Sequence, residues 1–352
     1  MIKVLIVDDS TVFSDLFTKI LKSDSEIEIV GRARNGLEAV ELVDKLRPNV
    51  ITMDISMPVM DGVTATEEIM KRRPTPIIIV SSLVNKKETN ICFNALKAGA
   101  VDVVEKPIIT ALSDYKELED ELIRRIKVAA GVKLFTPLWV YKGRGKKEAS
   151  KIDEEQAVKK AGELHKKIKR IIVIGASTGG PVAINTVLSA LPPDFPVPCL
   201  VVQHIAKGFL DGLVDWLGKE CRIKVKIANQ SENLECGTAY FPPEDEDIGF
   251  YKNEAIKIYK SQPYEGHRPS ITTMMKGAAE AFGAGVIGVL LTGMGRDGVE
   301  GLKAIRAAGG RTIVQDEATS AVFGMPKEAI DSNAADYVLP VDRIAKHIMM
   351  MV

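Results

Sequence analysis

The sequence predicts an α/β protein with two domains in succession, each built around a largely parallel sheet. Short apolar runs alternate with segments whose apolar residues recur at helical spacing. This alternation occurs twice and lapses in between. Because strands that alternate with helices form parallel sheets covered on both faces, we expect a doubly wound (βα)5 domain at residues 1–130. A linker at 131–168 and a second α/β domain at 169–352 should follow.

Length and charge narrow the class of protein. The 352 residues are enough for two hydrophobic cores. Lys plus Arg and Asp plus Glu both number 47, so no net charge favours nucleic acid or a membrane surface as partner. The four cysteines lack the spacing of a zinc site or a disulfide framework. The chain begins with a strand rather than a signal peptide, and no apolar run is long enough to span a membrane, so we expect a soluble cytoplasmic protein.

Five strand–helix pairs are predicted in residues 1–130. The predicted strands are Lys3–Val7, Glu28–Gly31, Val50–Ile55, Pro76–Ser82 and Val101–Val104. The predicted helices are Thr11–Lys22, Leu37–Leu46, Val63–Arg72, Lys87–Ala98 and Asp114–Val128. Ligands of such sheets bind at the carboxyl ends of the strands, so the residues at those ends are the candidates for function.

Acidic residues follow two of these strands. Asp8 and Asp9 end the first strand and Asp54 ends the third. Three carboxylates at one edge repel each other, a cost usually tolerated only where a divalent cation binds, and oxygen ligands favour Mg²⁺. Ser81 and Lys106 end the fourth and fifth strands and can bind phosphoryl oxygens. Each aspartate alone is more typical of a helix cap, but the five residues together favour a site for Mg²⁺ and a phosphoryl group.

Several segments together resemble the phosphoacceptor receiver domain of two-component signalling. They are Asp8-Asp9-Ser10, Met53–Pro58, Asp61-Gly62, Ser81 and Lys106-Pro107. The resemblance implies that Asp54 accepts phosphate from a histidine kinase. It also implies that Asp9, Asp54 and the backbone carbonyl of Ser56 hold Mg²⁺, with Asp8 helping through water. Val103 stands where receivers often carry an aromatic switch residue, which leaves the relay of phosphorylation to the surface open.

The predicted linker is rich in lysine. Periodicity lapses at Gly131–Gly145, and Ala157–Leu164 has the spacing of a solvated helix. Glutamates between the lysines favour a soluble hinge over a nucleic-acid site. His165 in this segment is expected to be exposed and without a role.

A second strand–helix alternation begins at Ile171. The predicted strands are Ile171–Ile174, Pro198–Gln203, Lys224–Ile227, Thr238–Phe241, Ala255–Tyr259, Gly285–Thr292, Arg311–Gln315 and Tyr337–Leu339. The predicted helices are Pro181–Leu191, Leu210–Leu217, Ser270–Phe282, Gly298–Ala308 and Pro326–Asp331, with a terminal helix that contains His347. The three short strands between residues 224 and 259 are expected to be partly antiparallel.

The segment Gly175–Gly180 lies between a predicted strand and a predicted helix. It places the Ser177 hydroxyl at the edge of the sheet, beside a helix N-terminus whose free N–H groups attract negative charge. The segment also fits the G-x-S-x-G pattern of serine hydrolases, although such a turn more often binds a phosphate or only reverses the chain. A dinucleotide site is not supported, because the next strand should then end in an acid and it ends in Gln203-His204.

Ser177, His204 and Asp297 each follow a predicted parallel strand. A nucleophilic serine needs a base, and the base needs a carboxylate that fixes its tautomer. His204 and His267 are the candidate bases, since the other two histidines lie in the linker and the terminal helix. Alone, His204 is more typical of a buried structural histidine and Asp297 of a helix cap, but together at one edge they favour catalysis. The order Ser, His, Asp differs from that of α/β-hydrolases.

The second half resembles the catalytic domain of chemotaxis receptor protein-glutamate methylesterases. The matching segments are Gly175–Gly180, Gln203-His204, His267–Ser270, Thr292–Gly298 and Phe323–Lys327. The resemblance implies Ser177 as nucleophile, His204 as general base and Asp297 as its orienting carboxylate, with no metal at this site. The other positions that match the lining of the family's active site are Thr178, His267 and Met294.

The family resemblance implies that the protein hydrolyses glutamate γ-methyl esters on the cytoplasmic helices of a chemoreceptor, deamidates glutamines there, and so serves sensory adaptation. An unphosphorylated receiver packed against the Ser177 edge would block this substrate, and phosphorylation of Asp54 would relieve the block. The alternative is a response regulator whose second domain only binds a ligand or partner, which has no need of a serine, a histidine and an aspartate together. A DNA-binding regulator is less favoured, because the second half lacks a helix-turn-helix pattern and a concentrated basic face.

Overall fold

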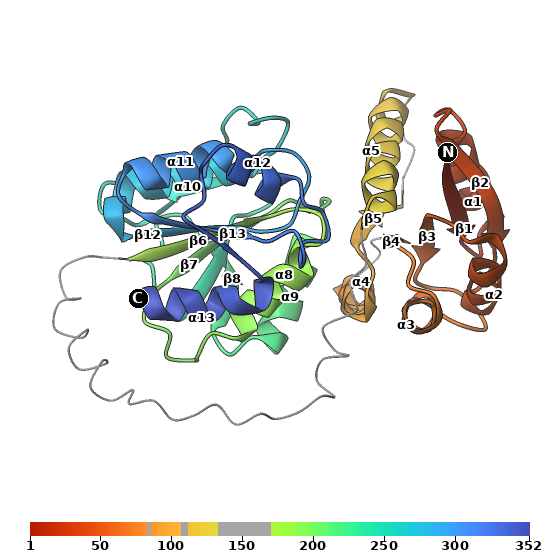
Figure 1. The fold of residues 1–352 in the computed structure, drawn as a ribbon, viewed down its shortest axis with the longest axis horizontal. Helices are drawn as coiled ribbons and strands as arrows, with labels where there is room; N and C mark the ends of the chain where they lie inside the picture. Colours follow the sequence, from red (N-terminus) through yellow and green to blue (C-terminus); the bar gives the residue numbers. More distant parts are fainter. Residues whose placement is uncertain (83–85, 107–111, 133–169) are drawn as a thin grey trace.

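The computed structural model describes residues 1–82, 86–106, 112–132 and 170–352, which fold into two α/β domains (Figure 1). The strands of the first domain are β1 (Ile2–Val7), β2 (Ile27–Ala33), β3 (Val50–Asp54), β4 (Ile77–Ser81) and β5 (Asp102–Glu105). Its helices are α1 (Thr11–Leu21), α2 (Gly36–Leu46), α3 (Gly62–Arg72), α4 (Lys86–Ala98) and α5 (Leu112–Ala130). These elements match the predicted ones, with ends that differ by a residue or two.

Within the described residues, the first sheet has five parallel strands in the order β2-β1-β3-β4-β5. Strands β3 and β4 are buried along their whole length, because helices cover both faces of the sheet. The predicted (βα)5 doubly wound fold is therefore confirmed. The order puts the carboxyl ends of β1 and β3 side by side and leaves β5 at an edge.

Polar residues fix where the first helices begin. Ser10, Asn35 and Asp61 precede α1, α2 and α3, and the side chain of each accepts a hydrogen bond from a backbone N–H of the first turn. Such a cap contributes about 1 kcal/mol relative to alanine. Ser10 and Asn35 follow closely on the ends of β1 and β2, whereas the loop from Asp54 to the cap Asp61 is longer.

The second domain has a larger set of elements. Its strands are β6 (Ile171–Ala176), β7 (Cys199–Gln203), β8 (Lys224–Ile227), β9 (Thr238–Phe241), β10 (Asp247–Phe250), β11 (Ile256–Tyr259), β12 (Val286–Leu290), β13 (Arg311–Gln315) and β14 (Tyr337–Leu339). Its α-helices are α8 (Gly180–Ser189), α9 (Leu210–Glu220), α10 (Ile271–Phe282), α11 (Val299–Ala307), α12 (Met325–Asp331) and α13 (Val341–Met351), and a 3₁₀ turn spans Gly283–Gly285.

Seven of these described strands form one parallel sheet in the order β14-β13-β12-β6-β7-β9-β8. The three short predicted strands are partly antiparallel, as expected, because β11 pairs with β10 in the antiparallel sense. Strands β8 and β9 instead extend the main sheet in parallel, and β10 was not predicted. A short strand does not encode its partner, which is chosen by the tertiary crossover. At the centre, β12, β6 and β7 are neighbours.

The predictions for the linker concern residues that lie mostly outside the described part. The hinge, the solvated helix and the exposed His165 all fall within 133–169. Among the described helices, none is long and apolar enough to cross a membrane.

The two domains share an interface formed by α4 and α9. The rings of Phe93 and Trp216 stack with centroids 5.7 Å apart, and both side chains are buried. Nearby, the Lys97 ammonium lies 2.8 Å from the Glu220 carboxylate. The buried apolar cluster runs without interruption from one domain into the other. This packing brings β5 and α5 to the side of the second domain (Figure 1).

Candidate functional sites

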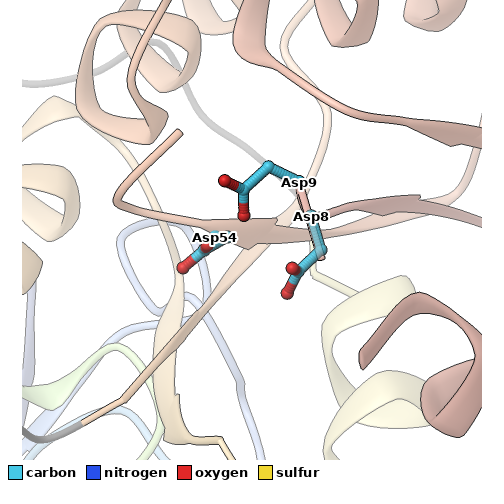
Figure 2. Close-up of side chains that lie close together, drawn as sticks. All are labelled: Asp8, Asp9 and Asp54. Carbon is cyan, nitrogen blue, oxygen red and sulfur yellow. The ribbon is translucent and has the colours of Figure 1, made fainter. Parts of the chain in front are cut away.

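At the carboxyl edge of the first sheet, Asp8, Asp9 and Asp54 offer carboxylate oxygens within 4.8 Å of one another (Figure 2). Asp8 and Asp54 are buried, and Asp9 is exposed. The proximity follows from the strand order, because β1 and β3 are hydrogen-bonded neighbours. Three hard carboxylate donors open to solvent on one side fit Mg²⁺.

Lys106 is the buried cation of this edge. Its ammonium lies 2.8 Å from Asp8 and 2.9 Å from Asp54. Burial alone would lower the pKa of Lys106, but its bonds to the two carboxylates outweigh burial and raise it. The pKa of Asp54 is raised, because burial outweighs the attraction of Lys106. One lysine does not neutralise three carboxylates, so the edge keeps a negative charge that a divalent cation would offset.

The other predicted receiver residues lie around this cluster. Ser81 is buried at the end of β4, and its carbonyl accepts the Lys106 N–H at 2.8 Å. Ser56 is exposed in the loop after β3, two residues past Asp54. Val103 is 2% exposed and donates its N–H to the Asp102 carboxylate at 2.9 Å. A buried valine cannot swing between a buried and an exposed position as a switch aromatic does.

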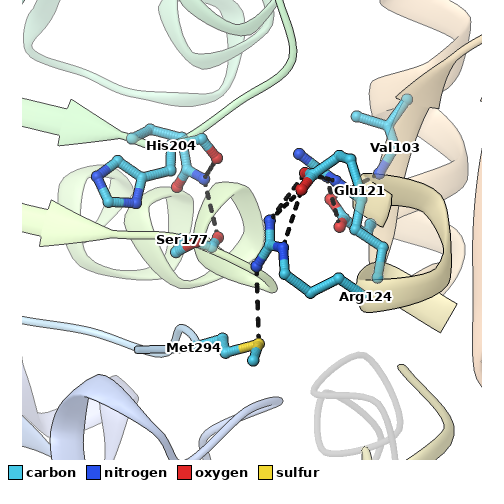
Figure 3. Close-up of polar contacts among 9 residues, drawn as sticks. Val103, Glu121, Arg124, Ser177, His204 and Met294 are labelled. Carbon is cyan, nitrogen blue, oxygen red and sulfur yellow. Dashed lines mark hydrogen bonds and ion pairs between the residues drawn. The ribbon is translucent and has the colours of Figure 1, made fainter. Parts of the chain in front are cut away.

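At the carboxyl edge of the second sheet, the structure brings His204 and Asp297 into direct contact. The His204 Nε2 and the Asp297 Oδ2 are 3.0 Å apart. Ser177 follows β6, which is the strand between β12 and β7, and it lines the same cavity as His204 (Figure 3). Within the described residues, the His204 Nδ1 is buried without a hydrogen-bond partner. The hydroxyl of Ser177 is therefore near the ring but not bonded to it.

Asp297 accepts hydrogen bonds from three further donors besides His204. Its oxygens accept the N–H groups of Ile271 at 2.8 Å and Thr272 at 2.9 Å, and the Ser270 hydroxyl at 3.1 Å. Burial alone would raise the pKa of Asp297, but the bond to His204 and the N–H donors of α10 lower it to about 2. The ionised carboxylate can only accept, so His204 donates through Nε2. Asp297 is thus a cap of α10 and the partner of His204 at once.

His267 packs on His204, with ring centroids 4.0 Å apart and planes 12° apart. Burial and the charge of His204 lower the pKa of His267 to about 4, so it is neutral at pH 7. Thr178 lines the same cavity as His267, and Met294 is 39% exposed in the loop before Asp297. The structure therefore gathers all six predicted residues of the second domain at one edge.

The cavity at this edge has a volume of about 590 Å³ and is shared by the two domains. Ser177, His204 and His267 line one side. The receiver contributes Glu121, Arg124 and Arg125 of α5, which the sequence did not connect with this site. Their contact with the second domain joins residues more than a hundred positions apart, and no local pattern identifies it.

Gln203 is a second residue whose importance the sequence understated. Its amide N–H₂ donates to the carbonyls of Ser177 at 2.8 Å and His204 at 2.7 Å. It therefore ties together the two loops that carry the serine and the histidine. An amide side chain at the end of an apolar strand is the sequence signal that could have identified Gln203.

Asp247 on β10 anchors the loop that carries His267. One of its oxygens accepts the Ser270 N–H at 2.9 Å, and the other accepts the Ser261 hydroxyl at 2.7 Å. The side chain is 1% exposed. Because the two serines bracket residues 262–269, Asp247 fixes both ends of that loop.

Two glycines allow the close approach of the backbone to Ser177. A Cβ on Gly293 would lie 2.6 Å from the Ser177 Cβ, a contact that real side chains do not make. Gly179 has φ = 76°, in the left-handed region that glycine adopts without strain, and caps α8. The Ser177 N–H donates to the Thr292 carbonyl at 3.0 Å, so the two loops are joined through the backbone.

Comparisons with known proteins agree with this geometry. The family model for the CheB methylesterase matches residues 172–348, and that for the response regulator receiver domain matches residues 4–113. A protein-glutamate methylesterase/protein-glutamine glutaminase of Syntrophus aciditrophicus is 42% identical over 98% of this chain and 97% of its own. A relative of the same name from Pyrococcus horikoshii is 38% identical over 100% of this chain and 94% of its own.

A solved structure supports the same assignment for the second half. The crystal structure of the Thermotoga maritima CheB methylesterase catalytic domain covers 52% of this chain and 99% of its own, with 37% identity and a TM-score of 0.51. The chain belongs to the CheB methylesterase family, with a receiver domain ahead of the methylesterase domain.

Proposed function

We propose that this chain is a phosphorylation-regulated serine hydrolase that removes methyl groups from glutamate γ-methyl esters on chemoreceptors. The observation that carries the proposal is the bond between His204 and Asp297 beside Ser177. A module that only binds a partner has no use for a buried histidine fixed by a fully bonded carboxylate. The names of the relatives give the substrate class.

The tautomer of His204 determines the first step. Because the Nε2–H of His204 donates a hydrogen bond to Asp297, the lone pair lies on Nδ1, the nitrogen that has no partner among the described residues. In the proposed reaction, Nδ1 removes the proton of the Ser177 hydroxyl as its oxygen bonds to the ester carbonyl carbon. The tetrahedral intermediate expels methoxide, which takes the proton from His204 and leaves as methanol. His204 then deprotonates a water molecule that hydrolyses the acyl-enzyme, which frees Ser177 and a glutamate.

Backbone N–H groups would stabilise the negative oxygen of each tetrahedral intermediate. The donors are those at the start of α8, after Ser177, together with the N–H of Met294. One such donor is typically worth about 3 kcal/mol in the transition state. Thr178, His267 and Met294 would shape the surrounding pocket. A glutamine side chain would react by the same steps with ammonia as leaving group, which accounts for the glutaminase activity in the names of the relatives.

The receiver site would carry the regulation. Asp54 would accept a phosphoryl group from a histidine kinase, and Lys106 and Ser81 would bind its oxygens. Asp9, Asp54 and the carbonyl of Ser56 would hold Mg²⁺, with Asp8 acting through water. The ion supplies the charge neutralisation that lets a phosphoryl group approach a cluster of carboxylates. Since the substrate helices and the kinase lie in the cytoplasm, so would this protein.

The test is methanol release from a methylated receptor, with and without a small phosphodonor and Mg²⁺. The parent should release methanol faster with the phosphodonor, Ser177→Ala should release none, and Asp54→Ala should not respond to the phosphodonor. No release from the parent under either condition would overturn the esterase proposal. Release at the same rate with and without the phosphodonor would support the esterase activity and contradict its regulation by phosphorylation.

A further inference from the structure

Two of the contacts among the described residues link the receiver to the edge of the methylesterase site. The Gly179 N–H, at the start of α8, donates to the Val101 carbonyl at 3.2 Å. The Arg124 guanidinium Nη1 lies 3.7 Å from the sulfur of Met294 (Figure 3). The first contact involves an N–H at the start of the helix proposed to hold the oxyanion. The second reaches Met294, in the loop before Asp297, from Arg124, which lines the cavity.

Arg124 does not reach Met294 as a free side chain. Its Nε and Nη2 donate to the two oxygens of Glu121 and to one of them twice, at 2.7–2.9 Å. A paired contact of this kind fixes the plane of a guanidinium. Nη1 is left on the far side of the fork, where it faces Met294.

Glu121 is held in turn from the receiver side. It accepts the Arg125 Nε at 2.6 Å, and the Arg125 Nη1 donates to Asp102 at 2.8 Å. Burial raises the pKa of Glu121, but the charges of Arg125 and Arg124 outweigh it and hold the pKa below its usual value. The side chains of Arg125 and Asp102 are only 16% and 14% exposed, so this end is little screened by solvent. We term the four side chains the α5 latch: Asp102, Arg125, Glu121 and Arg124.

The receiver end of the α5 latch lies on β5. Asp102 is the first residue of this strand and directly follows Val101, whose carbonyl holds the Gly179 N–H. The other oxygen of Asp102 accepts the N–H of Val103, the position of the usual aromatic switch. The far end of β5 leads directly into Lys106, which is bonded to Asp54. One short edge strand thus joins the phosphorylation site to the Val101–Gly179 and Arg124–Met294 contacts with the methylesterase domain.

We propose that the α5 latch closes the methylesterase cavity and makes it responsive to Asp54, in place of an aromatic switch. This inference rests on the proposed function. With the latch formed, Arg124 lies at the cavity edge against Met294 and the Val101 carbonyl engages the Gly179 N–H. When Lys106 turns to a phosphoryl group, β5 shifts, the bond between Asp102 and Arg125 weakens, and both contacts are released together.

The test compares basal rates of methanol release by the unphosphorylated full chain. Arg124→Gln should raise the basal rate roughly tenfold, within the usual range of such couplings, and leave the phosphorylated rate unchanged. Asp102→Asn, at the far end of the latch, should raise it by a smaller factor. The basal rate of the double variant should not exceed that of Arg124→Gln, because the two residues act through the same series of hydrogen bonds. Lys127→Gln is the matched control: it removes a cation of α5 that binds Asp24 at 2.7 Å, and should leave the basal rate unchanged.

An unchanged basal rate in Arg124→Gln, with a parent that responds to the phosphodonor, would overturn the latch. A raised rate in Arg124→Gln without any change in Asp102→Asn would overturn its connection to β5. A second readout does not depend on esterase activity. The charge of Arg124 lowers the pKa of His267 by more than its partner Glu121 raises it, and NMR of the ring measures the net effect. Beryllium trifluoride with Mg²⁺ should raise that pKa in the parent but not in Arg124→Gln, and an unmoved pKa in the parent would contradict the proposal.

Discussion

The carboxyl edges of the two sheets place aspartates in the same topological position and treat them differently. At the receiver edge, Asp8 and Asp54 share the single cation of Lys106, and Asp9 adds a third carboxylate. At the methylesterase edge, Asp297 alone receives four donors. Burial therefore raises the pKa of Asp54, whereas the donors outweigh burial at Asp297 and lower its pKa to about 2.

The difference separates a site that changes state from one that keeps its state. The uncompensated negative charge at the receiver edge would be stabilised by a divalent cation, so under the proposed function binding and phosphorylation there would alter the balance of forces on β5. Because Asp297 already accepts four hydrogen bonds, a ligand adds no further stabilisation of its charge, and the carboxylate holds His204 in one tautomer throughout. Preorganised dipoles of this kind cost no reorganisation during the reaction. Four substitutions test the contrast, from the largest expected effect to the smallest.

Asp297→Asn should have the largest effect. The amide cannot present two acceptor oxygens to α10 and also fix the Nε2 proton of His204, so kcat should fall by roughly 10⁴. Methanol release from a methylated receptor measures the loss. Asp316→Asn is the control, because Asp316 ends β13 at the same edge and caps only its own turn at Thr319. Equal losses in the two variants would contradict a specific role for Asp297.

Gly293→Ala should cause the second-largest loss of catalytic rate. The added Cβ would lie 2.6 Å from that of Ser177, and a displacement of about 1 Å at a reacting group can cost roughly 100-fold in rate. Gly218→Ala is the matched change, because a Cβ at Gly218 in α9 meets nothing within 4 Å. Unfolding midpoints of both variants separate misplacement of the serine from loss of structure. An unaffected rate in Gly293→Ala would show that the loop tolerates the methyl group.

His267 should make stability depend on pH between about 6.5 and 4. Its folded pKa of about 4 lies below the unfolded value of 6.5, so in this window the unfolded chain binds a proton that the folded chain does not. Stability therefore falls as the pH drops from 6.5 to 4, by about 2 kcal/mol after allowance for partial exposure. Asp297 has the same sign at lower pH: its pKa is also lowered on folding, so its contribution is present above about pH 4 and is lost as pH falls toward 2.

Urea unfolding at pH 7, 5.5 and 4.5 measures the His267 effect. The variant His267→Gln lacks the titrating ring, so its stability should decline less over this range than that of the parent. The difference between the two proteins isolates His267 from the other acids that titrate below pH 5. Parallel curves for parent and variant would refute the assignment.

Asp9→Asn should have the smallest effect, and it should stabilise the protein rather than impair it. Removing one of three crowded carboxylates should stabilise the metal-free protein by about 1 kcal/mol, since the charge is at the edge of the cluster and screened by solvent. Added Mg²⁺ should then stabilise the variant less than the parent. Asp44→Asn, on the exposed face of α2, should change little in either condition. Thermal unfolding with and without Mg²⁺ measures both, and a destabilised metal-free Asp9→Asn would contradict the crowding.

Much of the fold was predictable because the signals are local. Apolar runs predict the strands and helical spacing predicts the helices. A polar residue that directly follows a strand is thereby placed at the carboxyl edge of the sheet. Strand β10 was missed because its four residues, Asp247–Phe250, include a glycine and only two large apolar side chains. The sequence also left open which of the short strands would be antiparallel, since strand partners depend on crossovers that no four-residue segment encodes.

The sites divide in the same way. The sequence identifies Ser177, His204 and Asp297 because each follows a strand. It does not show that Asp297 takes its donors from α10, whose first residues lie some 25 positions earlier. Nor does it show Arg124 at the cavity, which depends on how two domains dock. Contacts between distant segments follow from packing of the whole molecule rather than from any pattern within a window.

The stacked pair of Phe93 and Trp216 gives the protein an optical signal of its own. The indole is 4% exposed because a ring from the other domain covers it, so its emission should shift to longer wavelength when the domains part. The chain has two tryptophans, and Trp139 lies outside the described residues, so Trp139→Phe would leave a single fluorophore at the domain boundary. Opening and closing could then be followed in real time in the unlabelled protein, independently of any receptor.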